Sequence, residues 1–147
     1  MAKSTIYLRN LISQALLERN TFSINNLYVG LFSQTPTLDN ATDGTEFGIG
    51  VDGSGYKRVT ATSKWTQNTN SLPAVSYELN TLIGFESKSK GWNGNYSTAT
   101  ITGVGLWDHE QAGNCLMYTN INPTRTIDTN QDMDIPVSGI VIDFTTV

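Results

Sequence analysis

The chain of 147 residues is poor in charge, cysteine and histidine. Only 15% of its residues are charged, and its lysines and arginines are scattered singly within a formal net charge of −4. Proteins that bind nucleic acid present a clustered basic surface, so we expect no nucleic-acid partner. Cys115 is the only cysteine, which excludes an internal disulfide and a zinc site made of cysteines. The fold must therefore be stabilised by packing.

Long apolar runs are also missing from the sequence. No stretch approaches the run of about 20 apolar residues that a membrane-spanning helix requires. Near the N-terminus, Asn10, Ser13 and Gln14 interrupt the apolar residues, unlike the continuous core of a signal peptide. We therefore expect a soluble protein without a secretion signal, made in the cytoplasm of a cell.

What the chain does contain favours β structure. Hydrophobic residues make up 38% of the sequence, and Thr, Asn, Ser and Gly dominate the remainder. Such a mixture suits short strands joined by turns. We predict one domain over residues 1–147 that is mainly β, an antiparallel β-sandwich or barrel-like domain with one N-terminal amphipathic α-helix.

The helix is predicted over about residues 4–20. Apolar residues recur there with the spacing of one helical stripe, at Leu8, Leu11, Ile12, Ala15 and Leu16. Ser4 or Thr5 can cap the first turn. Because a lone helix must bury its apolar stripe, we expect the helix to share a core with the sheet and to cover an open face or end. Assembly through the stripe is the alternative.

Alternating apolar and polar residues predict a series of strands. They are expected over residues 27–32, 56–62, 75–79, 81–85, 99–107, 115–121, 133–137 and 140–144. Gly103 lies where a bulge would correct a slip in the apolar pattern, and Asn93-Gly94 predicts a tight turn. Residues 33–54 are polar and rich in glycine, so they are predicted to form a long loop.

Two patterns resemble catalytic or metal sites without completing them. His109 and Cys115 are residue types that form nucleophilic pairs, but Cys115 begins an apolar strand, where free cysteine is usually a buried hydrophobe. Asp39, Asp43 and Glu46 surround a glycine as in a calcium loop, yet the spacing differs from that of an EF-hand. We therefore expect no enzyme activity and no metal.

A glycine pattern also stands in the wrong context for a cofactor. Gly48, Gly50 and Gly53 match a dinucleotide-binding fingerprint, which has to open a helix so that backbone amides meet the pyrophosphate. A strand pattern follows instead, so we expect no cofactor.

The candidates for surface recognition lie in two polar segments. Trp92 and Tyr96 flank the predicted turn, which favours exposed aromatic rings that would contact a protein or stack on a sugar. Asp39, Asp43 and Phe47, in the long loop, are further candidates for assembly contacts.

Three blocks of residues together resemble a family of small phage proteins that are commonly labelled tail-fibre proteins. The blocks extend over nearly the whole chain: 27–36 with 44–46 and 55–58, then 103–108 with 113–116, and finally 123–127 with 135–136 and 139–143. The resemblance implies a structural protein of the bacteriophage virion that binds other virion proteins and copies of itself.

The position of such a protein in the virion stays open. A tail-fibre or baseplate component is the first expectation, and a capsid auxiliary protein that decorates or cements the phage head is the alternative. A carbohydrate-binding module that uses Trp92 and Tyr96 on a host-surface glycan is a more distant one.

Overall fold

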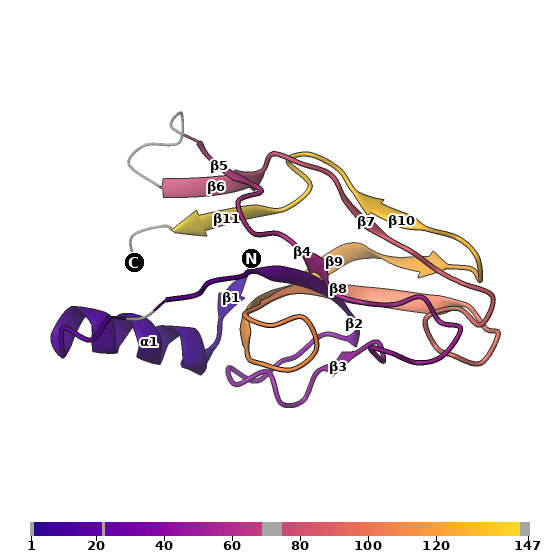
Figure 1. Ribbon diagram of the computed structural model, residues 1–147, viewed down its shortest axis with the longest axis horizontal. Helices are drawn as coiled ribbons and strands as arrows, with labels where there is room; N and C mark the ends of the chain where they lie inside the picture. The colour runs from indigo at the N-terminus through magenta and orange to yellow at the C-terminus, as the bar shows by residue number, and fades with distance from the viewer. Residues whose placement is uncertain (1, 22, 69–74, 145–147) are drawn as a thin grey trace.

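Two antiparallel β layers face each other in the computed structural model, which describes residues 2–21, 23–68 and 75–144 (Figure 1). The first layer contains β1 (Lys3–Ser4), β2 (Tyr28–Gln34), β3 (Thr45–Glu46), β4 (Val59–Thr60), β8 (Ala99–Trp107) and β9 (Cys115–Ile127). These strands form one sheet in the order β1-β9-β8-β2-β3, and β4 also pairs with β2.

The second layer consists of two smaller sheets. Its strands are β5 (Trp65–Asn68), β6 (Val75–Leu79), β7 (Ile83–Phe85), β10 (Met133–Ile135) and β11 (Val141–Phe144). They pair in the orders β11-β6-β5 and β10-β7. One hydrophobic core contains residues of both layers, so the architecture is a sandwich, and none of the described sheets closes into a barrel.

The centre of the first sheet depends on two glycines that face each other. Gly30 of β2 pairs with Gly105 of β8. A Cβ atom on either residue would lie 2.8 Å from the ring of Trp107, closer than real contacts allow. The paired glycines therefore make room for the indole of Trp107, which packs on Phe32 with ring centroids 5.1 Å apart.

The bulge predicted at Gly103 is confirmed, because the register between β8 and β9 shifts between Ile101 and Gly103. Thr102 lies in this shift, and its hydroxyl accepts a hydrogen bond from the backbone N–H of Thr35 at 2.9 Å. The bulge thus connects the sheet to the start of the long loop, the segment predicted over residues 33–54, which contains the short strand β3.

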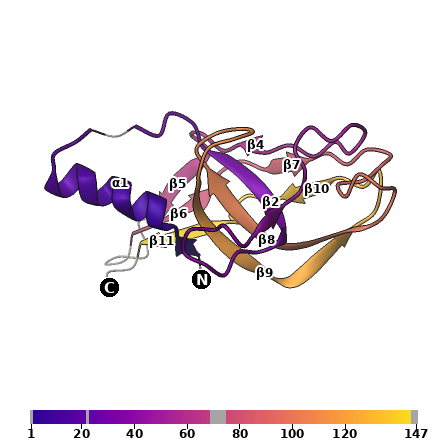
Figure 2. The same cartoon turned by 90° about the horizontal axis from the view of Figure 1, so that it is seen from below.

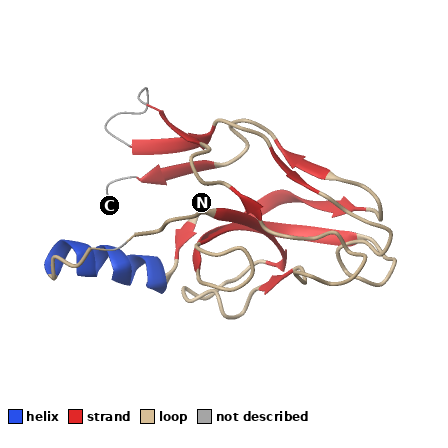
Figure 3. Ribbon diagram, in the orientation of Figure 1, coloured by secondary structure: helices blue, strands red, loops and turns tan. Residues whose placement is uncertain are grey.

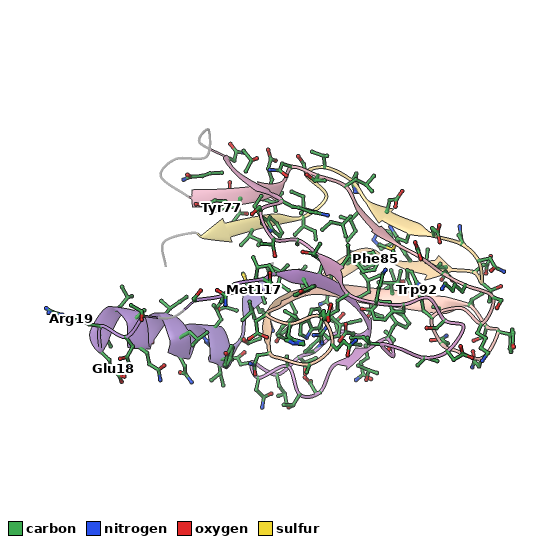
Figure 4. All side chains as sticks on the ribbon, viewed as in Figure 1. Glu18, Arg19, Tyr77, Phe85, Trp92 and Met117 are labelled. Atoms are coloured by element: carbon green, nitrogen blue, oxygen red, sulfur yellow. The ribbon has the colours of Figure 1, made fainter. Side chains whose placement is uncertain are left out.

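Four aromatic residues fill the core at the end of the sandwich where β7 leads into β8. Trp92 packs against Phe47, Tyr56 and Phe85, with ring centroids 5.6 to 6.2 Å apart. Figure 4 shows Phe85 and Trp92 together at this end. The expectation of an exposed ring is wrong for Trp92, which is only 2% exposed, and Phe47 of the long loop is buried as well.

Trp92 lies in a tight turn that directs its side chain into the core. The N–H of Gly94 bonds the carbonyl of Gly91 at 2.9 Å, so a turn is present over residues 91–94, but Trp92 and Asn93 lie at its centre, one residue earlier than predicted. Gly91 and Gly94 both have positive φ, at 65° and 72°. The indole N–H of Trp92 donates to the carbonyl of Glu86 at 2.7 Å. This bond satisfies the polar atom and lets the ring enter the core.

The helix α1 (Ile6–Leu17) stands apart from both layers, as Figures 2 and 3 show. It contains no buried residue. The expectation that it shares a core with the sheet and covers an end of it is therefore wrong, although the helix itself and the cap at Thr5 are confirmed.

Most predicted strands are present, with different bounds. The segments 75–79 and 99–107 match β6 and β8, whereas β9 continues to Ile127 and the segment predicted over 56–62 holds only the two residues of β4. The strand β5 was not predicted. Its exposed polar residues, Thr66 and Gln67, give no clear alternation of apolar side chains.

We predict that Trp92→Ala lowers the free energy of unfolding by about 3–5 kcal/mol, because truncation of a buried aromatic residue leaves a cavity. Chemical denaturation monitored by far-UV circular dichroism would measure the change. Tyr96→Ala is the matched control, because Tyr96 is 69% exposed. We expect that variant to stay within about 0.5 kcal/mol of the unmodified protein. Equal effects of the two changes would contradict the assignment of Trp92 to the core.

Candidate assembly surface

The helix α1 is fixed to the first sheet at its base. The residues of β1 pair with Met117 and Tyr118 of β9. The next residue, Thr5, is 1% exposed, and its Oγ1 donates to the carbonyls of Cys115 and Leu116 at 2.7 and 3.1 Å. The same oxygen accepts the N–H of Leu8, so Thr5 is both the N-cap of the helix and its buried anchor.

The long loop contacts the first turn of the helix through Asp39. Its backbone carbonyl accepts the N–H of Ile6 at 2.9 Å, and its carboxylate pairs with Arg9 at 2.6 Å. The ion pair is about half exposed on both sides, so it contributes little stability and mainly orients the helix base.

Beyond this base the helix exposes large apolar side chains. Ile12, Leu16 and Leu17, which we call the helix patch, are 40%, 74% and 83% exposed. Arg9 is the only charged residue within α1. A solvent-facing helix usually carries charged or polar residues opposite its apolar stripe, and in α1 that face is polar but almost uncharged.

A cleft of about 400 Å³ separates the base of the helix from the neighbouring loops. Tyr7 and Leu11 line its helical side, residues 23–26 line a second side, and the β8–β9 connection contributes Asp108, His109 and Gly113. The side of α1 that carries Tyr7 and Leu11 is therefore separated from the neighbouring loops by this cleft and contacts the rest of the domain only in part.

Arg58 fixes the β8–β9 connection through hydrogen bonds to its backbone. Its guanidinium is paired with the carboxylate of Glu46 at 2.7 Å and lies 4.4 Å from the ring centroid of Trp107. Its Nη1 donates to the carbonyls of His109 and Ala112, both at 2.6 Å. Because the Arg58 and Glu46 side chains are only 6% and 15% exposed, this connection has a fixed base beside the helix.

Tyr56 completes the polar network around Glu46. Its hydroxyl bonds Glu46 Oε1 at 2.9 Å and accepts the N–H of Leu31 at 2.7 Å. Burial and the negative charge of Glu46 raise the pKa of Tyr56 well above its ordinary value. The phenol therefore stays neutral and serves as a structural hydrogen-bonding group.

The five sequence-based surface candidates do not form one site. Asp39 lies at the base of α1. Asp43 closes the long loop by accepting hydrogen bonds from the Thr37 hydroxyl and from the backbone N–H groups of Leu38 and Thr37. The bond from the Thr37 hydroxyl, followed by the backbone bonds, lowers the pKa of the Asp43 carboxyl group. Phe47 and Trp92 meet in the core.

Tyr96 is the exposed aromatic residue among these candidates, and it belongs to the β7–β8 connection. That connection forms the end of the molecule opposite α1 (Figure 1). The recognition roles of all five residues stay predictions. Sequence reasoning did not identify Leu17 or the anchor role of Thr5. The scarcity of charge in the helix was the available signal for an exposed binding element.

The His109 and Cys115 side chains form hydrogen bonds with different residues, not with each other. His109 Nδ1 accepts the N–H groups of Gln111 and Ala112, and the Cys115 thiol donates to the Met117 carbonyl at 3.4 Å. Burial raises the pKa of the Cys115 thiol to about 12. A thiol with this pKa is protonated near neutral pH and is a poor nucleophile.

Among the described residues, no three histidine, cysteine or acidic side chains gather as metal ligands. No helix in the described part of the chain has the length and apolar character needed to cross a membrane.

We predict that Thr5→Val destabilises the helix base, because valine keeps the shape but loses the bonds to two carbonyls and the cap. The expected cost is about 1–2 kcal/mol. Hydrogen exchange of the amides in residues 6–9 should accelerate. Ser13→Ala is the control on the same helix, because the Ser13 hydroxyl bonds only an exposed carbonyl, that of Arg9. Unchanged exchange in Thr5→Val would exclude the anchor role.

Alkylation tests the state of Cys115. Against the ordinary value of 9.0, a pKa of about 12 lowers the thiolate fraction at pH 8 by roughly a thousandfold. We therefore expect iodoacetamide to modify the folded protein at least about a hundredfold more slowly than the urea-unfolded protein. Equal rates in the two states would show an activated, accessible thiol.

Comparison with known proteins identifies the family. A search of curated proteins finds no match. A family model described as "Podophage GP4 fiber I protein gp80" matches residues 3–143. The resemblance to phage tail-fibre proteins that the sequence blocks indicate is thereby confirmed across both layers and α1. The chain belongs to the family of the podophage GP4 fiber I protein gp80.

Proposed function

We propose that this protein is a structural component of the phage tail fibre or of the baseplate to which fibres attach, that it acts by protein–protein assembly, and that it catalyses no reaction. The observation that carries the proposal is the helix patch on α1. Leu16 and Leu17 are 74% and 83% exposed on a helix whose base is fixed by a buried hydrogen-bonding threonine. Binding of an apolar partner would remove these side chains from water, which is favourable in free energy.

The length of the helix supports this role. A helix of 12 residues is marginally stable in water without packing of an apolar face. The Thr5 cap and the Asp39 contacts stabilise only the first turn, so contact with a partner would stabilise the rest. A virion assembly supplies partners of this kind, whereas a small-molecule enzyme has no need of a projecting apolar helix.

A role in binding host glycans has less support. Trp92, one of the two aromatic rings on which that alternative depended, is 2% exposed and packs in the core. Tyr96 remains exposed, but sugar platforms are usually built from more than one ring and nearby polar groups.

The position in the virion can be measured directly. We expect a density map of purified particles to contain the two-layered sandwich at the tail, with α1 against another protein chain. Density on the head shell would instead support a capsid auxiliary protein. Absence of the chain from purified particles would overturn the structural role.

Incorporation into particles tests the helix patch. We expect the double variant Leu16→Asp, Leu17→Asp, supplied in trans to a phage that lacks the gene, to be incorporated at least about tenfold less than the unmodified protein, because burial of each leucine contributes about 1.5–3 kcal/mol. The double variant Leu82→Asp, Val137→Asp is the matched control, because it adds the same two charges at residues that are 49% and 56% exposed outside the helix. Quantitative mass spectrometry of particles gives the ratio. Full incorporation of the double variant would exclude α1 as the assembly element.

A further inference from the structure

The β8–β9 connection, residues 108–114, is built around the only histidine of the chain. We propose that this connection is a pH-sensitive element, in which protonation of His109 releases the backbone amides of Gln111 and Ala112 and thereby reshapes one wall of the cleft beside α1. The element is independent of the assembly role proposed for α1, because all of its contacts lie within the domain.

The imidazole of His109 closes the connection from within. Its Nδ1 accepts the N–H of Gln111 at 3.2 Å and the N–H of Ala112 at 3.3 Å. A ring nitrogen accepts hydrogen bonds only while it carries no proton, so the neutral ring has its proton on Nε2. The turn in this structure therefore requires a neutral His109.

Protonation removes the acceptor on which the turn depends. In the charged imidazolium both ring nitrogens are donors. A proton on Nδ1 of His109 would point at the N–H groups of Gln111 and Ala112, so the ring has to turn away and both amides lose their partner. Because the connection is exposed, water can replace the lost bonds, and the change stays local.

Arg58 holds the carbonyl side of the same backbone. Its Nη1 donates to the carbonyls of His109 and Ala112, both at 2.6 Å, and its charge is compensated by Glu46 at 2.7 Å. Arginine keeps its charge throughout the physiological pH range. On acidification the carbonyl contacts persist while the amide contacts are lost, so the connection changes shape on a fixed base.

The charged groups next to His109 in the connection are carboxylates. Asp108 precedes it and Glu110 follows it. The Asp108 carboxylate accepts the backbone N–H of Asn114 at 2.6 Å and its side-chain amide at 3.2 Å. A carboxylate that is already a hydrogen-bond acceptor can also accept from an imidazolium, since its two oxygens have about four lone-pair sites. The turned, charged ring thus has partners nearby.

The cleft carries the change toward the helix. His109 and Gly113 line it from the connection, opposite Tyr7 and Leu11 of α1 (Figure 1). Tyr7 is the titratable group on the helical side, and tyrosine is ordinarily neutral at and below neutral pH. Residues 23–26, which line the cleft as well, carry no charge. The group that changes charge at this cleft near neutral pH is therefore His109.

The pH range of the change follows from the residue type. Histidine is the side chain that ordinarily changes charge between pH 5 and 8, whereas carboxyl side chains ordinarily titrate below this range. The Cys115 thiol, which begins the next strand, has a pKa of about 12 and stays protonated throughout. A change in the connection between pH 5 and 8 that disappears with His109 is therefore assigned to this ring.

Amide exchange measured by NMR gives the first test. Protection is the exchange rate of an unstructured amide divided by the measured rate at the same pH. We expect protection of Gln111 and Ala112 to fall about threefold or more between pH 7.5 and pH 5.0, the effect of one lost hydrogen bond per amide. Lys64, whose N–H bonds the Ala61 carbonyl in another turn, should keep its protection. Equal protection of Gln111 and Ala112 at both pH values would overturn the proposal.

Two variants separate the titration from the shape of the turn. In His109→Asn, the side-chain oxygen can accept the same amides, as asparagine does in turns, but takes up no proton in this range. Protection should then be equal at both pH values. His109→Ala has no acceptor and should give low protection at both, and circular dichroism confirms that each variant is folded. An undiminished pH effect in His109→Asn, or full protection in His109→Ala, would contradict the role of the ring.

Nitrogen NMR of the imidazole tests the starting state directly. At pH 8 we expect the proton of the neutral His109 ring to reside on Nε2, because Nδ1 accepts the two amides. The ¹⁵N resonances of the two ring nitrogens distinguish this tautomer from the other. A neutral ring with its proton on Nδ1 would overturn the proposal, since that nitrogen would then be a donor.

Discussion

The guanidinium of Arg58 connects parts of the chain that are distant in sequence. It pairs with Glu46 of β3, lies over the Trp107 ring at the end of β8, and donates to the carbonyls of His109 and Ala112. A buried charge is costly unless it is paired and hydrogen-bonded, and here both conditions are met. The geometry of the surrounding strands is therefore constrained, because removal of either partner would leave an uncompensated charge in the sheet.

The paired glycines of β2 and β8 extend this constraint into the sheet. The Trp107 ring contacts Arg58, and the missing Cβ atoms of Gly30 and Gly105 provide the space that this ring occupies. The aromatic cluster around Trp92 then closes one end of the sandwich, while β1 and Thr5 fix the helix at the other. Fold and candidate surface thus depend on the same sheet.

Features that depend on local chemistry were predictable from sequence. The buried strand β8, the bulge at Gly103 and the cap at Thr5 each follow from a residue and its immediate neighbours. The burial of Trp92 does not, because it depends on Phe47, Tyr56 and Phe85, which come from other segments of the chain. The apolar stripe by itself did not predict the exposure of α1 for a similar reason: the stripe has the same spacing whether it is covered by its own sheet or by another chain, and only the scarcity of charge gave a further signal.

The separation of a rigid sandwich from an uncovered helix has a consequence for assembly. Because the core of the described chain contains no residue of α1, a change at Leu16 or Leu17 removes no contact of that core. In the proposed assembly role, the free-energy cost of exposing these side chains in the free chain becomes a driving force for binding a partner.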